Sequence, residues 1–157
     1  MRSFTKEQIE TARMTFEEMD FEERKANVGG MEFRYFVLPQ NLQPGLPYFV
    51  ARMTGRPEDG SLFGVSDKVP VELRDYPVFH EVMEFAGNQE PGKCLKTLKR
   101  ELEIVPQHSL NDYIGYRKRF FRGLIKFIHG EKEREHYTLR DMHEFQGSLD
   151  YLKSLRQ

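Results

Sequence analysis

The sequence contains no tryptophan and a single cysteine, Cys94. One thiol excludes an internal disulfide, and it excludes any zinc site that is built from several cysteines. Scarce cysteine is also typical of proteins in reducing compartments, and we therefore expect a cytoplasmic protein.

A dominant charge of one sign is also lacking, because 24 basic residues face 25 acidic ones. This balance gives no global field that would attract a polyanion, so nucleic acid is not expected as a partner. No apolar run approaches the ~20 residues of a membrane span, and charges interrupt the first sixteen residues, so neither a membrane segment nor a signal peptide is expected.

The phosphate-binding and nucleophile motifs of common enzymes are missing as well. The sequence has no P-loop, no GxGxxG turn and no GxSxG nucleophile elbow. Nucleotide-dependent and serine-hydrolase chemistry are correspondingly disfavoured.

What the chain does have is aromatic bulk, with 13 phenylalanines and 7 tyrosines in 157 residues. Burial of these large apolar side chains can stabilise one compact core, and we expect residues 1–157 to form a single α+β domain. The expected fold has one N-terminal helix, a small and mostly antiparallel three-stranded sheet, and about four helices packed on one side of it.

Local patterns give the positions of these elements. Thr5 and Gln8 have capping-box spacing at the start of the first helix. β-branched and aromatic runs predict strands at 31–38, 48–53 and 62–65, the last two antiparallel. Further helices are expected from Pro77 to a stop at Gly87 and Asn88, over 93–105 and 109–129, and from a cap at Thr138.

The helix that starts near Pro77 carries the most suggestive polar residues. His80 and Glu84 are four residues apart and therefore share one face, and Glu81 lies at the edge of the same arc. The rest of this helix is apolar. A polar stripe on an apolar helix must meet solvent, a cavity or a partner, because unpaired buried polar groups are costly.

This stripe resembles the HExxH helix of zincin metallopeptidases over one helix and the strand before it. The resemblance implies that His80 and Glu84 would bind a divalent metal such as zinc, with Glu81 as the catalytic general base. Glu84 stands where that family has its second histidine. Glu101, Glu103 and His108 follow, and none has a spacing that identifies it as a third ligand.

Residues 113–127 form a second candidate site, in which basic residues alternate with aromatic ones. Such a pattern could contact phosphates and stack bases. An amphipathic helix with its charges on the solvent face explains the same pattern more simply. Cys94, near the next helix start, fits either a stabilised thiolate or a buried inert thiol.

These observations leave the enzyme question open between two classes. The leading interpretation is a small α+β binding, interaction or regulatory domain whose partner is another protein or a second copy of the chain. The alternative is a zincin-like, metal-dependent hydrolase with a degenerate HExxE helix formed by His80, Glu81 and Glu84.

Overall fold

A computed structural model describes residues 4–56, 58, 60–86, 92–130 and 139–155. The chain divides into two compact units, Met1–Phe85 and Ala86–Gln157, which are described separately below. The helix stop expected at Gly87 and Asn88 and the cap expected at Thr138 lie outside the described residues. None of the helices in the described ranges is both long and apolar enough to cross a membrane.

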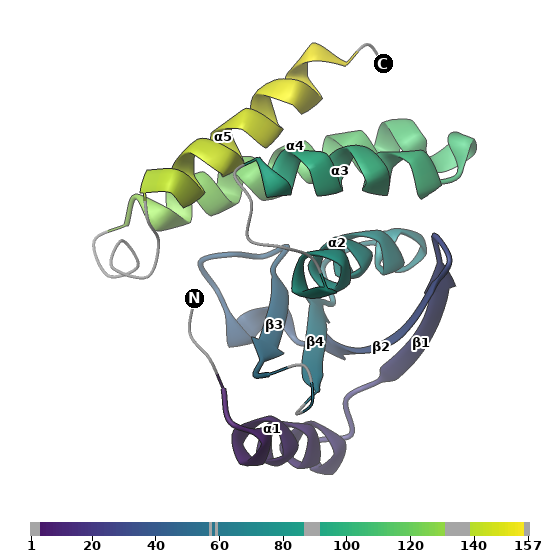
Figure 1. Ribbon diagram of the computed structural model, residues 1–157, viewed down its shortest axis with the longest axis vertical. Coiled ribbons are helices and arrows are strands. Elements are labelled where there is room, and N and C mark those ends of the chain that lie inside the picture. Colours follow the sequence, from purple (N-terminus) through teal and green to yellow (C-terminus); the bar gives the residue numbers. More distant parts are fainter. Residues whose placement is uncertain (1–3, 57, 59, 87–91, 131–138, 156–157) are drawn as a thin grey trace. The chain divides into compact units, whose positions relative to one another are not determined.

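The first unit is an α+β unit of two helices and four strands (Figure 1). Its elements are α1 (Lys6–Glu18), β1 (Glu23–Val28), β2 (Met31–Leu38), β3 (Val50–Thr54), β4 (Ser61–Ser66) and α2 (Asp75–Ala86), with short 3-10 turns at Gln40–Leu42 and Val71–Leu73. The predicted capping box is confirmed, because Thr5 and Gln8 each accept a hydrogen bond from the other's backbone N–H.

The sheet differs from the prediction in strand number and direction. Four strands lie in the order β1-β2-β4-β3, so the prediction of three strands was wrong. The expected antiparallel pairing of the last two strands is confirmed between β3 and β4. At the centre, however, β2 and β4 run parallel, with Phe36 opposite Gly64, which makes the sheet mixed.

The missed strand β1 pairs antiparallel with β2 across a two-residue turn. Gly29 and Gly30 form this turn with φ values of 58° and 78°. Positive φ at both central residues is what a type I′ hairpin turn requires, and glycine adopts it without steric cost. β1 was missed because it is an edge strand in which only Ala26 is buried and whose first three residues are charged.

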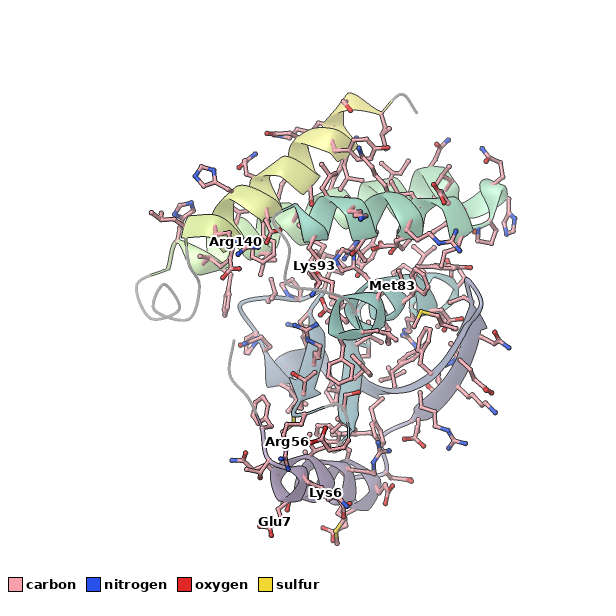
Figure 2. The ribbon with its side chains drawn as sticks, viewed as in Figure 1. Lys6, Glu7, Arg56, Met83, Lys93 and Arg140 are labelled. Carbon is pink, nitrogen blue, oxygen red and sulfur yellow. The ribbon has the colours of Figure 1, made fainter. Side chains whose placement is uncertain are left out.

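The two helices of this unit cover opposite faces of the sheet, because neighbouring residues of a strand point to opposite sides. Phe36 on β2 packs edge-on against Phe16 of α1, with ring centroids 5.3 Å apart. The preceding residue, Tyr35, donates a hydrogen bond to Asp75 in the first turn of α2. Figure 1 shows α1 and α2 on either side of the strands, and Figure 2 shows Lys6 and Glu7 on the outer surface of α1.

The second unit is helical. It contains α3 (Lys93–Ile104), a 3-10 turn (Gln107–Ser109), α4 (Leu110–Ile128) and α5 (Leu139–Ser154). α5 packs against both α3 and α4. The Phe121 and Phe145 rings, 6.4 Å apart, join α4 to α5, and Ser148 Oγ lies 3.2 Å from Cys94 Sγ, which joins α5 to α3.

Candidate metal centre

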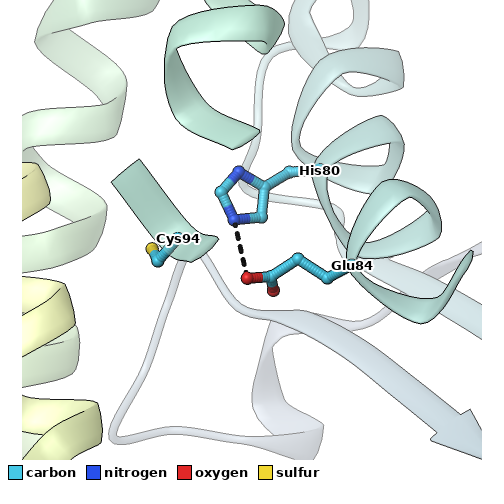
Figure 3. Close-up of side chains that lie close together, drawn as sticks. All are labelled: His80, Glu84 and Cys94. Atoms are coloured by element: carbon cyan, nitrogen blue, oxygen red, sulfur yellow. Dashed lines mark ion pairs between the residues drawn. The ribbon is translucent and has the colours of Figure 1, made fainter. Parts of the chain in front are cut away.

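His80 and Glu84 project from successive turns of α2 toward each other (Figure 3). His80 Nε2 lies 3.6 Å from Glu84 Oε2, and the His80 side chain is only 3% exposed. Burial of most of α2 follows from its apolar composition, which includes Val78, Phe79 and Val82. Cys94, also drawn in Figure 3, belongs to the second unit and is described with it.

The separation of 3.6 Å is informative because it exceeds the 2.7–3.2 Å range of N–H···O hydrogen bonds. Two ligand atoms of one tetrahedral zinc ion lie about 3.4 Å apart when each metal–ligand bond is ~2.1 Å long. The imidazole nitrogen and the carboxylate oxygen are therefore spaced like two ligands of one ion.

Glu81, the expected general base, lies beside Arg52 of β3. Arg52 Nε is 3.6 Å from Glu81 Oε2, and Arg52 Nη1 is 3.5 Å from the carbonyl oxygen of Glu81. Both side chains are mostly buried, so this ion pair is less screened than a surface pair would be. The guanidinium therefore occupies one side of the Glu81 carboxylate.

The residues considered as third ligands are Glu101, Glu103 and His108, and each either pairs with another side chain or is exposed. Glu101 is fully buried in the second unit, where Arg117 Nε lies 2.9 Å from its Oε2 and Arg117 Nη2 donates a hydrogen bond of 3.3 Å to its Oε1. The Tyr113 hydroxyl also donates to Glu101. Glu103 pairs with Arg100 at 3.2 Å, and His108 is exposed.

The structure corrects one expectation for the helix over residues 113–127. Its charged side chains were all expected on the solvent face, but the Arg117 side chain is only 2% exposed. Its guanidinium carbon lies 4.6 Å from the centre of the Phe120 ring and 4.8 Å from that of Phe121. Burial by itself would lower the pKa of Arg117, but Glu101 and then Tyr113, Tyr116 and Cys94 together raise that pKa above its ordinary value, so Arg117 stays protonated. Burial, followed by the charge of Glu101, raises the pKa of Tyr113 well above its ordinary value.

Cys94 is buried at the start of α3, as expected for a buried inert thiol. The Ser148 hydroxyl of α5 donates a hydrogen bond to its sulfur. The thiol therefore contributes to helix packing within the second unit.

Two ion pairs were not anticipated: the partly buried pair of Arg52 with Glu81 and the fully buried pair of Arg117 with Glu101. The sequence did contain a pattern that could have predicted the pair of Arg117 with Glu101. Glu101 follows Leu98 by three residues and precedes Val105 by four, which places it on the apolar stripe of α3. Arg117 likewise follows Tyr113 by four residues and precedes Phe120 by three. A charged residue on each of two apolar stripes indicates a buried pair.

Comparisons with other proteins do not assign the chain. No protein-family model, curated protein or solved structure matches it. The candidate site is therefore argued from its own geometry.

Tyr35 gives a measurable property of the contact between β2 and α2. Its hydroxyl donates a 2.6 Å hydrogen bond to Asp75 Oδ1. Burial, and then this bond, raise the pKa of Tyr35 above its ordinary value near 10. Because the folded state holds this proton more tightly, the resulting stability is complete below about pH 10 and is lost as the pH rises further.

We expect the difference in tyrosinate absorbance between wild type and Tyr35→Phe to show a group that titrates later than free tyrosine. The comparison isolates Tyr35, since the other tyrosines contribute equally to both proteins. A difference curve centred at the ordinary tyrosine pKa would contradict the structure.

Proposed function

We propose that this protein is a small binding domain whose ligand is a divalent transition-metal ion held by His80 and Glu84. The observation that carries the proposal is the 3.6 Å separation between His80 Nε2 and Glu84 Oε2 on a helix that is otherwise mostly apolar. The helix fixes this separation, because side chains at i and i+4 lie one above the other.

The donor set limits the kind of metal. Imidazole nitrogen suits zinc, copper, nickel and iron, whereas calcium and magnesium prefer sites made of oxygen alone. One imidazole and one carboxylate therefore favour zinc or a neighbouring transition metal. Two protein ligands leave room for water or an exogenous group on the ion.

The pairing of Glu81 with Arg52 supports binding over hydrolysis. A general base must take a proton from metal-bound water, and Glu81 would first have to leave the guanidinium. We accordingly place the zincin-like hydrolase second. That alternative predicts metal-dependent peptidase activity that Glu81→Gln abolishes.

A protein partner or self-association stays a prediction, which light scattering of the purified protein would test.

The proposal predicts a metal-dependent rise in thermal stability. Protein freed of metal by a chelator should gain about 2.7 kcal/mol when zinc is added to a hundred times its dissociation constant. Glu84→Gln keeps the size of the side chain but removes a ligand charge, and it should weaken zinc binding at least about tenfold, as measured by calorimetric titration. His80→Ala should abolish the effect.

His108→Ala is the matched control, since it removes an exposed histidine and should leave zinc binding unchanged. Circular dichroism of each variant shows whether it is folded before titration. Wild-type protein that binds no zinc, cobalt or nickel would refute the proposal, as would a folded Glu84→Gln variant with wild-type affinity.

A further inference from the structure

The charge of the chain is distributed unevenly between its two units. The second unit carries 14 basic and 10 acidic residues, and the first carries 10 basic and 15 acidic residues, which together make up the total of 24 and 25. The nearly neutral total therefore conceals a basic helical unit joined to an acidic α+β unit. Charge asymmetry between halves of a chain points to polyanion binding through the basic half.

The positive charge is concentrated on α4. α4 has five basic side chains and one acidic one, Asp112 in its first turn. The five are Arg117, Lys118, Arg119, Arg122 and Lys126. Arg117 is buried with Glu101, Lys118 is half-buried, and the last three are exposed.

The exposed cations form one line, which we call the α4 stripe: Arg119, Arg122 and Lys126. Spacings of three and four residues keep them on a single face of the helix. At a rise of 1.5 Å per residue the stripe is about 10 Å long. Exposed His129 extends the same line by three more residues. A linear row of cations complements a linear row of phosphates.

The α4 stripe lacks the apolar anchor that a membrane-surface helix needs. The apolar side of α4, with Tyr113, Phe121 and Leu124, is buried. Among the described residues the large exposed apolar side chains are Met14, Met19, Leu42, Val71 and Leu139, and none of them belongs to α4. Charge without an apolar wedge favours a phosphate backbone over a lipid surface.

We propose that the α4 stripe binds the phosphate backbone of a nucleic-acid duplex without reading its sequence. This reverses the expectation drawn from the total charge, because the relevant quantity is the charge of one helix face. An α-helix fits the ~12 Å width of the DNA major groove, and phosphate contacts made by arginine and lysine position a protein without specifying bases. The inference is independent of the metal proposal.

The test is fluorescence anisotropy of a labelled 20-base-pair DNA duplex, and of its RNA counterpart, at several salt concentrations in the presence of a chelator. Three phosphate contacts predict a slope of about −3 for the logarithm of the association constant against that of salt concentration. The triple variant Arg119→Gln, Arg122→Gln, Lys126→Gln should bind at least about tenfold more weakly and show a slope near zero.

A matched triple variant on the first unit, Arg34→Gln, Arg56→Gln, Lys68→Gln, removes the same charge from exposed positions and should leave binding intact. Equal losses in both triple variants would overturn the proposal, since only net charge would matter. Absence of binding to either duplex at low salt would also overturn it. Binding to anionic phosphatidylserine vesicles but not to the duplexes would assign the stripe to a lipid surface instead.

Discussion

Replacing Glu101 by alanine is expected to lower the free energy of unfolding by about 3–5 kcal/mol. Glu101 is fully buried, and Arg117, which is 2% exposed, is its ion-pair partner. Removing the carboxylate leaves the Arg117 guanidinium charged in the interior and leaves the Tyr113 hydroxyl without this acceptor. Urea denaturation followed by circular dichroism of the helices would measure the loss.

Two further variants separate the ion pair from helix propensity. Glu103→Ala, two residues along the same helix, breaks an exposed pair with Arg100 and should cost less than about 1 kcal/mol. Replacing both partners, as Glu101→Leu with Arg117→Met, should recover most of the stability, because no unpaired charge remains. If Glu101→Ala costs no more than Glu103→Ala, the buried pair does not stabilise the second unit.

Phe36→Ala is expected to destabilise the first unit by about 3–5 kcal/mol. The Phe36 ring is 1% exposed and packs against Phe16, and the Arg13 guanidinium carbon lies 5.9 Å from its centre. Its loss would leave a cavity between β2 and α1. Thermal and urea unfolding of the variant would measure the change.

Phe36→Leu, which keeps an apolar side chain of intermediate size, should cost less than Phe36→Ala. Met14→Ala on the outer side of α1 is the surface control and should change stability by less than about 0.5 kcal/mol, because Met14 is 58% exposed. A loss for Phe36→Ala as small as that for Met14→Ala would mean that α1 does not depend on this contact.

The sequence predicted best those features that depend on neighbours along the chain. His80 and Glu84 were placed on one face of a helix because an i, i+4 spacing has the same geometry in any α-helix. The strand at 31–38 matches β2 residue for residue, because its apolar residues are dense and a glycine turn precedes it. In these cases the local pattern alone determined the structure.

Features that join distant segments were the ones missed. Parallel pairing of β2 with β4 brings together Phe36 and Gly64, which are 28 positions apart. The residues of one strand do not indicate which other strand it will pair with. Arg52 and Glu81, 29 positions apart, meet only because α2 packs over β3. Such contacts depend on topology, which hydrophobic periodicity does not specify.

The charged composition of β1 also has a consequence for the behaviour of concentrated solutions. β1 is an edge of the sheet, and an edge strand offers a row of backbone groups to the strand of another molecule. Glu23, Arg24 and Lys25 follow one another in this strand, and charged side chains hinder such unplanned pairing. The residues that concealed the strand in the sequence are thus those that protect the folded protein from aggregating through it.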